Sequence, residues 1–339
     1  MSVLFPTTLV GSYPQPGWLI DHDRLTVPRV PAPDLWLVPP DRLEEAKDDA
    51  VRLAVEDQLA AGIDIVTDGE SRRESYSVRF AGSLDGIDLE HPGSAPGRGA
   101  ANRPMVVPRV VGPIRRPGPV EVAEVRYLRS LTDHLIKVTL PGPFTMSQQA
   151  EDNFYNDEAA LAMAYAPVVN DEARDLLAAG ADIVQIDEPF MAARPDKARA
   201  FGLAAFEAAI AGLPGTTAVH LCFGYAALVK DRPAAYPFLE ELADTVVDQI
   251  SIETAQSGLD CSVLERLGDK VVILGVLDLS TSQVESAQVI VGRVERALAH
   301  VGAERLVLAP DCGMKFLPRA SAAGKLAALC EAARVLRDR

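Results

Sequence analysis

The feature that most constrains the fold of this 339-residue chain is a regular alternation of short apolar runs with longer helical stretches. The apolar runs are rich in Val, Ile and Leu, as is typical of strands that are buried on both faces of a parallel sheet. We predict eight such strands, at Thr8–Tyr13, Asp64–Glu70, Leu135–Pro143, Asp182–Pro189, Thr216–Gly224, Asp248–Thr254, Lys270–Asp278 and Arg305–Asp311. Nearly all of them border a predicted helix, at about Pro40–Ala61, Val120–His134, Glu158–Ala179, Lys197–Leu213, Ala235–Thr245, Cys261–Leu267, Gln283–Val301 and Ala320–Arg337.

Eight strand–helix units favour a closed (β/α)8 barrel. A doubly wound open sheet is the alternative, but the glycine-rich fingerprint that usually accompanies such a sheet is missing. Residues 71–120 interrupt the alternation and are rich in Gly, Pro and Arg. We therefore predict an α/β TIM barrel that spans residues 1–339 as a single domain, with a small excursion after the second strand at 71–120.

The overall charge argues against several classes of function. The formal net charge of −15 repels phosphate backbones and anionic lipids, so we expect neither a nucleic acid nor a membrane as partner. The N-terminus lacks a basic start, and no run of about 18 apolar residues occurs, so we expect no signal peptide and no membrane-spanning helix. Four cysteines in a chain of this length do not form a disulfide framework. Together these features favour the cytoplasm.

Polar side chains stand at the ends of the predicted strands, whose interiors are apolar. In a (β/α)8 barrel the catalytic groups lie at the carboxyl ends of the strands, so these positions are the candidates for function. They are Ser12, Asp68, Glu70, Asp187, Glu188, His220, Cys222, Glu253, Asp278, Asp311 and Cys312.

Four of these residues suggest a metal site. His220 and Cys222 lie two apart on one strand, so their side chains point to the same side, and Glu253 and Cys312 end two other strands. One imidazole, two thiolates and one carboxylate can form a tetrahedral zinc set, and two soft thiolates argue against magnesium or calcium. Each residue alone has a simpler explanation, as a small buried thiol, a satisfied core histidine or an ion-paired acid. Spacing alone leaves both explanations open.

Three further residues are candidates for substrate binding. Glu70 and Asp187 could bind a substrate ammonium group or act as acid and base, or they could be salt-bridged or helix-capping acids. The backbone at Ser12, in the sequence GSYP, could offer N–H groups to a substrate carboxylate, although an ordinary turn serine fits equally well. Cys261 and Cys330 fall on predicted helices and are expected to be buried thiols.

With these residues assembled, the chain resembles the C-terminal catalytic barrel of cobalamin-independent methionine synthases and their short single-barrel relatives. The resemblance runs nearly end to end, and several motifs in the family's order are specific in combination. The matching pieces are Thr7–Gln15 (TTLVGSYPQ), Thr67–Glu70 (TDGE), Asn102–Pro117, Pro141–Thr145 (PGPFT), Gln185–Pro189 (QIDEP), His220–Gly224 (HLCFG), Ile250–Thr254 (ISIET), Gly275–Asp278 (GVLD) and Ala309–Lys315 (APDCGMK).

The resemblance implies a zinc-dependent transfer of a methyl group to the thiol of homocysteine, forming methionine. The family's zinc ligands match His220, Cys222, Glu253 and Cys312. Its homocysteine-binding groups match Ser12, Glu70 and Asp187. Asp278 and Ser280, after the GVLD strand, are the predicted catalytic positions, and Asp278 and Asp311 are expected to support the ligands.

The sequence departs from the full-length synthases at three points. Ser280 stands where they have a histidine that is regarded as an acid in methyl transfer. The tryptophan that stacks on the folate ring is replaced around Ser147–Gln149, and the long N-terminal barrel has no counterpart. These departures favour a methyl-corrinoid protein over a folate polyglutamate as methyl donor. His22, Tyr225 and Glu188 are candidates for the missing acid.

Two alternative functions remain. One is alkyl transfer to, or C–S cleavage of, another thiol. A relative uses the same zinc site to open epoxides with coenzyme M, which carries a sulfonate and no amine. Two acids, Glu70 and Asp187, suit an ammonium better than a sulfonate, so homocysteine ranks first. The other alternative is a non-catalytic barrel that binds zinc and thiol, and Ser280 is the feature that supports it.

Overall fold

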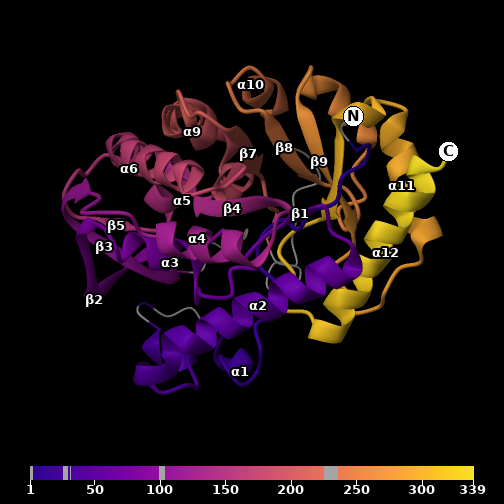
Figure 1. Cartoon of the computed structure of the whole chain (residues 1–339). Coiled ribbons are helices and arrows are strands. Elements are labelled where there is room, and N and C mark those ends of the chain that lie inside the picture. The colour runs from indigo at the N-terminus through magenta and orange to yellow at the C-terminus, as the bar shows by residue number, and fades with distance from the viewer. Residues whose placement is uncertain (1–2, 26–29, 31, 99–103, 225–235) are drawn as a thin grey trace.

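The computed structural model describes residues 3–25, 30, 32–98, 104–224 and 236–339. Its centre is a parallel seven-stranded sheet in the order β1-β4-β6-β7-β8-β9-β10. The order follows the chain, so each strand lies beside the next one and the sheet curls round on itself (Figure 1). The strands are β1 (Ile65–Val66), β4 (Leu135–Pro141), β6 (Ile183–Asp187), β7 (Thr216–His220), β8 (Gln249–Glu253), β9 (Val271–Leu277) and β10 (Leu306–Pro310).

Two residues near the N-terminus complete the barrel. Thr7 forms a parallel bridge with Leu308 of β10, and Thr8 forms one with Ile65 of β1. The backbone N–H of Thr8 donates to the Leu308 carbonyl at 3.0 Å, and that of Ile65 donates to the Thr7 carbonyl at 2.9 Å. The N-terminal segment thus fills an eighth position between the first and last strands, and the predicted (β/α)8 barrel is confirmed.

The first predicted strand, Thr8–Tyr13, is the least accurate of the eight. Only Thr7 and Thr8 pair with neighbours as strand residues do. Further along, the Tyr13 N–H donates to the Gly69 carbonyl at 2.9 Å, and the Ser12 carbonyl accepts from the Met314 N–H at 2.7 Å. The backbone at Ser12 and Tyr13 is therefore engaged by two loops, and it leaves the sheet.

The larger helices pack around the outside of the barrel (Figure 1). They are α2 (Leu43–Ala61), α4 (Val122–Leu131), α6 (Glu158–Ala178), α9 (Leu203–Ile210), α11 (Ala287–Leu298) and α12 (Arg319–Arg337), with a 3-10 helix η4 (Cys261–Leu267) between β8 and β9. Shorter segments are α1 (His22–Leu25), α3 (Tyr76–Ala81), α5 (Pro143–Gln148), α7 (Pro189–Ala193), α8 (Pro195–Lys197), α10 (Leu239–Ala243), η1 (Pro33–Leu35), η2 (Pro40–Arg42), η3 (Ala198–Gly202) and η5 (Ala303–Arg305).

Capping residues set several of the helix boundaries. Asp157 begins α6 by accepting from the N–H groups of Ala159 and Ala160 at 2.9 and 3.1 Å. Ser286 caps α11, which is why this helix starts later than the predicted Gln283. Gly62 ends α2 with a φ of 91°, a left-handed conformation that glycine adopts without strain, and the chain turns there into β1.

The segment between β1 and β4 holds a long antiparallel hairpin, formed by β2 (Asp85–Pro96) and β3 (Pro104–Arg115). A third short strand, β5 (Glu151–Asp152), pairs in parallel with β3. In Figure 1 the hairpin lies at the side of the barrel, beside α3 and α4. The segment predicted as a small excursion at 71–120 therefore contains a hairpin whose two strands have 12 residues each.

A recurring aspartate links neighbouring strands at the amino-terminal side of the barrel. In each case the residue stands just before a strand, and its Oδ2 accepts from the backbone N–H near the start of the preceding strand at 2.8 Å. The pairs are Asp64 with Thr7, Asp182 with Ile136, and Asp248 with Thr217. These bonds satisfy N–H groups at the strand ends and fix the register of the sheet.

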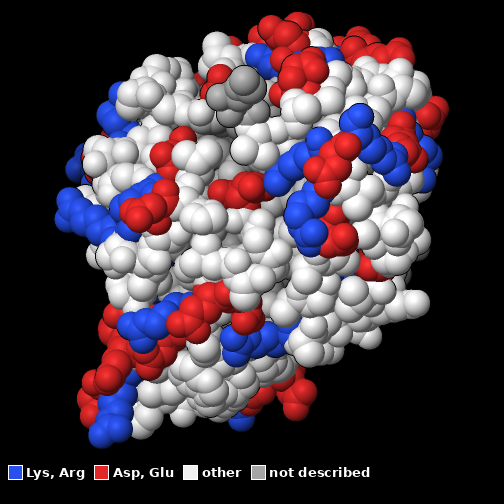
Figure 2. Space-filling view, turned by 45° about the vertical axis from the view of Figure 1, so that its right-hand side comes forward, with Lys and Arg blue, Asp and Glu red and all other residues white. Residues whose placement is uncertain are grey.

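The molecular surface carries charges of both signs. Figure 2 shows basic and acidic side chains lying next to one another over much of one face. Arg319 and Asp57 form such a pair, with Nε 2.7 Å from Oδ2. Because exposed pairs of this kind are worth only about 0–1 kcal/mol, the stability of the fold rests on its buried contacts.

No helix in the described part of the chain is long and apolar enough to cross a membrane. The location of the protein in the cell stays a prediction.

We predict that Asp64→Ala destabilises the closed barrel by about 1–3 kcal/mol, because the buried Thr7 N–H loses its acceptor and Arg337 loses an ion pair. Chemical denaturation of wild type and variant measures the difference. Asp64→Asn keeps one carbonyl oxygen and is expected to lose less. An alanine variant as stable as wild type would contradict the role of this residue in closing the barrel.

Candidate metal centre and substrate pocket

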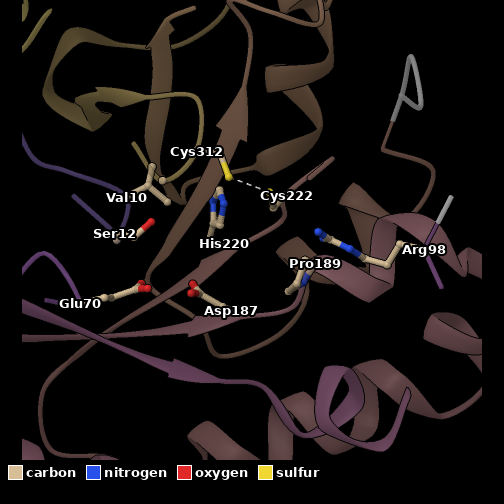
Figure 3. A pocket seen from close by; sticks show the side chains of 11 residues that line it. Val10, Ser12, Glu70, Arg98, Asp187, Pro189, His220, Cys222 and Cys312 are labelled. Carbon is tan, nitrogen blue, oxygen red and sulfur yellow. Dashed lines mark hydrogen bonds between the residues drawn. The ribbon is translucent and has the colours of Figure 1, made fainter. Parts of the chain in front are cut away.

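A pocket opens at the carboxyl ends of the barrel strands, where the sequence predicts the functional residues. Figure 3 shows the side chains that line it, several of which point toward one another. The lining residues are Val10, Gly11, Ser12, Glu70, Arg98, Asp187, Pro189, His220, Cys222, Cys312 and Gly313.

The four predicted metal ligands come together at this pocket. His220 ends β7, Cys222 comes two residues later, Glu253 ends β8, and Cys312 lies just after β10. All four side chains are buried, and one candidate ligand atom from each lies within 4.8 Å of the others. Residues from three separate strands therefore form one group that could hold a metal ion, while their individual roles as ligands stay a prediction.

The imidazole of His220 is oriented for such a role. Its Nδ1 lies 2.9 Å from Oγ of Ser251, on the neighbouring strand β8. Its Nε2 is buried and has no hydrogen-bond partner within the described residues. A buried ring nitrogen without a partner is costly, and coordination of a metal would satisfy it.

The two thiols of the group are free and very close, with the sulfurs of Cys222 and Cys312 2.8 Å apart. The hydrogen bond between them lowers the pKa of the Cys222 thiol and raises that of Cys312. The Gly224 N–H also donates to the Cys222 sulfur at 3.0 Å. The pair therefore favours one thiolate and one thiol, and a divalent cation would favour loss of the second proton.

A second carboxylate holds the loop after Glu253. Asp311 is fully buried and accepts from the N–H groups of Thr254, Ala255 and Gln256 at 3.2, 3.0 and 2.6 Å. A side chain at Gly275 would place its Cβ 2.5 Å from Asp311 Oδ1, so glycine makes room for this contact. Burial raises the pKa of Asp311 to about 6.

The carboxylate of Glu253 itself is hydrogen-bonded to the loop that follows β7. Its Oε1 accepts from the backbone N–H of Phe223 at 2.9 Å. Asp311 and Phe223 therefore hold Glu253 from two directions, through its own backbone loop and through its side chain. Such bonds reduce the freedom of a ligand before a metal arrives.

The two predicted substrate acids also line the pocket, and Figure 3 shows both carboxylates on the side away from the sulfurs. Glu70 has a left-handed φ of 53°, and its Oε1 accepts from Thr139 Oγ1 at 3.1 Å. A Cβ at Gly11 would lie 2.4 Å from that oxygen, so only glycine leaves space there. Asp187 Oδ1 accepts from Gln185 Nε2 at 2.7 Å.

Burial raises the pKa of both carboxyls, and it brings that of Asp187 to about 7. Buried acids with raised pKa values are often functional, because a charged partner can compensate for the lost solvation. The predicted Ser12 lies on the pocket wall as well. Six of the seven predicted metal and substrate residues thus line the pocket, and the seventh, Glu253, lies beside it in the group with His220 and the two cysteines.

The two predicted catalytic residues lie away from this region, in the loop after β9, and neither lines the pocket. Asp278 Oδ1 accepts from the N–H and the hydroxyl of Ser280 at 2.8 and 2.6 Å. The backbone of Asp278 is held by Glu285 and Lys325. Ser280 is exposed, and the catalytic roles of both residues stay predictions.

Arg98 lines the pocket and is absent from the residues that the sequence predicts for it. It lies just after β2, and its guanidinium lies over the Phe190 ring at 5.5 Å. Arg194 lies over the same ring at 5.1 Å and donates to the Pro96 carbonyl at 2.6 Å, which fixes the end of the hairpin against the barrel. No local pattern in the irregular 71–120 segment signals that one arginine reaches the pocket.

Two of the three candidates for the missing acid lie in the described part of the chain, and both have hydrogen-bond partners there. Glu188 accepts from the N–H groups of Phe144 and Thr145 at 3.0 and 2.7 Å, so it caps the start of α5. A Cβ at Gly142 would lie 2.2 Å from Glu188 Cδ, which explains the glycine in PGPFT. The ring of His22 bonds to the Gln15 carbonyl at 2.9 Å. Tyr225 lies outside the described residues.

A barrel whose mouth gathers one imidazole, two thiols and one carboxylate beside a pocket with two acids has the arrangement of a candidate metal site next to a pocket of small-molecule size. Residues 5–335 match the family model described as the catalytic domain of cobalamin-independent synthase. The chain belongs to this family, and the resemblance seen in its sequence is confirmed.

Two relatives extend over nearly the whole chain. The methionine synthase of Saccharolobus solfataricus is 31% identical over 339 residues, which cover 99% of this chain and 96% of the relative. The structure of a B12-independent methionine synthase from a Shewanella species, in complex with selenomethionine, is 34% identical, with a TM-score of 0.90. That match covers 99% of this chain and 98% of the other.

A third structure is similar in fold alone. It is a putative vitamin-B12-independent methionine synthase from Listeria monocytogenes, with a TM-score of 0.73 at 19% identity. The match covers 99% of both chains.

We predict that Asp311→Asn weakens the affinity for Zn²⁺ roughly 10- to 100-fold although it removes no ligand of the group. The amide cannot accept from all three backbone N–H groups, so the loop after Glu253 loosens. Competition with a chromogenic chelator measures the affinity. Asp260→Asn, a similar change at a turn outside the pocket, serves as control. Unchanged affinity in Asp311→Asn would show that the loop does not order the metal group.

Proposed function

We propose that this chain is a zinc-dependent S-methyltransferase that converts homocysteine to methionine. The observation that carries the proposal is the joint placement, in one pocket, of a thiol- and imidazole-bearing metal group and two buried acids. The metal group would bind the sulfur of the substrate, and the two acids would bind its amino group. Family membership supports the same reaction, since the relatives that match nearly end to end are named methionine synthases.

The ligand set fits zinc. His220 would bind through Nε2, Cys222 and Cys312 through their sulfurs, and Glu253 through a carboxylate oxygen. Two thiolates with one imidazole suit a borderline-soft ion better than magnesium or calcium. Bound there, Zn²⁺ would supply one thing, a lower pKa for the substrate thiol at neutral pH.

The residues of the pocket would bind and orient the amino acid. Glu70 and Asp187 would hold the ammonium group between two carboxylates, and an ammonium bound there favours their ionised forms against the effect of burial. The backbone at Ser12 would meet the substrate carboxylate. Binding both ends of the molecule directs its sulfur toward the methyl donor and lowers the entropic cost of reaction.

The methyl donor stays a prediction from the sequence. Ser147, in the region where the related synthases stack a tryptophan on folate, is buried in α5, and its hydroxyl donates to the Phe144 carbonyl at 2.7 Å. Ser280 is bonded to Asp278 and exposed. The absence of the tryptophan and of the histidine at these two positions of the sequence favours a donor other than a folate polyglutamate, and on that ground alone we propose a methyl-corrinoid protein.

We predict that Cys312→Ser binds Zn²⁺ about 100-fold more weakly than wild type and loses thiol alkylation, because serine does not supply a thiolate. Elemental analysis of purified protein measures the metal, and loss of free homocysteine thiol measures the reaction. Cys261→Ser, a buried thiol outside the group, is expected to keep both. Full zinc content and alkylation in Cys312→Ser would refute the ligand assignment.

We predict that the zinc-loaded protein binds homocysteine at least about tenfold more tightly than coenzyme M, because two acids attract an ammonium and repel a sulfonate. Calorimetric titration gives the affinities, and proton release reports binding of the thiol as thiolate. Asp187→Asn should reduce the preference. Tighter binding of coenzyme M would instead support alkyl transfer to, or C–S cleavage of, another thiol.

An assay with methylcobalamin, methyltetrahydrofolate and a methyl-corrinoid protein then separates an enzyme from a binding protein. Methionine formed with any of the three supports the proposed function. A zinc-loaded protein that binds homocysteine but forms no methionine with any of the three donors would support a non-catalytic barrel.

A further inference from the structure

A lysine lies buried inside the barrel, and the proposed reaction leaves it without a role. Lys137 belongs to β4, and its side chain is fully buried. Its neighbours in register include Ile183 of β6, a member of the apolar cluster that fills the barrel interior. An amine in such surroundings loses its hydration, so the fold must gain something from keeping it there.

The lysine is connected to the pocket by one glutamine. Lys137 Nζ donates to Gln185 Oε1 at 2.7 Å, and Gln185 Nε2 donates to Asp187 Oδ1 at 2.7 Å. The same Nε2 also donates to the carbonyl of Val10, at 2.8 Å, on the pocket wall. A continuous chain of hydrogen bonds therefore runs from the barrel interior to a carboxylate in the pocket.

The donors and acceptors in this series of hydrogen bonds determine which way the Gln185 amide faces. An ammonium group only donates hydrogen bonds, so it requires the oxygen of the Gln185 amide on its side. The amide nitrogen must then face Asp187 and Val10, and both of these groups are acceptors. Without Lys137 the buried Gln185 Oε1 would lose its donor, and the amide that donates to Asp187 would be held less firmly.

The charges support the same arrangement. Glu70 and Asp187 are both buried acids in the pocket, and the positive charge of Lys137 lowers the pKa of Asp187 against the effect of burial. Burial lowers the pKa of Lys137 to about 7, while the charges of Asp187 and Glu70 act in the opposite direction.

We propose that Lys137 is a positioning residue for the amino group of the substrate, acting through Gln185 to orient Asp187. The inference rests on the proposed function, in which Asp187 binds that amino group. Lys137 itself touches neither substrate nor metal in this account. It selects between thiols that have an amino group and thiols that lack one.

The test compares two ligands on the zinc-loaded protein, homocysteine and 4-mercaptobutyrate, which has the same thiol and carboxylate but no amine. Wild type is expected to prefer homocysteine. Compared with wild type, Lys137→Met is expected to bind homocysteine about tenfold more weakly and to bind 4-mercaptobutyrate with almost unchanged affinity. The reason is that only homocysteine has an amino group for Asp187 to bind. Isothermal calorimetry gives both dissociation constants independently of turnover.

Three further variants sharpen the result. Gln185→Leu removes the residue that connects Lys137 to Asp187, and it should cause the same selective loss of homocysteine affinity. This variant therefore carries the test if Lys137→Met does not fold. In an Asp187→Asn background, Lys137→Met should have little further effect, since residues that act in series are not additive. Lys47→Met removes another mostly buried lysine, paired with Glu44 on α2 away from the pocket, and should leave both affinities unchanged.

Equal loss for both ligands in Lys137→Met, or no loss for either, would overturn the positioning role while leaving the proposed function intact. A wild-type protein that binds homocysteine no better than 4-mercaptobutyrate would instead remove Asp187 as the ammonium-binding group. The positioning role would then fall with it. The two failures are therefore distinguishable.

Discussion

The close approach of four buried side chains at the mouth of the barrel is the constraint on which the rest of the site depends. One imidazole, two thiols and one carboxylate place their ligand atoms within 4.8 Å of one another. Such a group is costly to assemble without a cation, because it combines desolvation with repulsion between anions. The fold offsets that cost through fixed strand ends, through Ser251, which is hydrogen-bonded to the His220 ring, and through Asp311, which holds the loop after Glu253.

Sequence patterns could predict the barrel because it depends on short-range regularities, whereas the group of four ligand-type residues is predicted from strand ends together with the family resemblance. Apolar runs mark the strands, and the barrel topology brings the carboxyl ends of all strands, with the residues just after them, to one rim. The predicted N-terminal strand is too long, since its later backbone bonds to Gly69 and Met314 rather than to a sheet neighbour. Arg98 and Lys137 reach the pocket region through contacts with residues distant in sequence, and no local pattern contains that information.

The polar interior shows how a barrel can combine stability with selectivity. Lys137, Gln185 and Asp187 form one hydrogen-bonded row in an otherwise apolar centre. On another side of the pocket, Asp311 performs a comparable service for the loop after Glu253. One side chain proposed to meet the substrate and one proposed to meet the metal are therefore each supported by a neighbour that would meet neither, which limits their motion before binding.

The hairpin of β2 and β3 gives the pocket a wall of separate origin. Most lining residues come from the ends of barrel strands, whereas Arg98 comes from the hairpin, which is docked through Arg194 and the Phe190 ring. The pocket is thus modular: one part is tied to the architecture of the barrel, and the other is an appended loop. Substitutions in the hairpin can change the pocket wall at Arg98 while the four-residue group at the strand ends is preserved, so an accessory element can alter what the pocket accepts without disturbing the barrel.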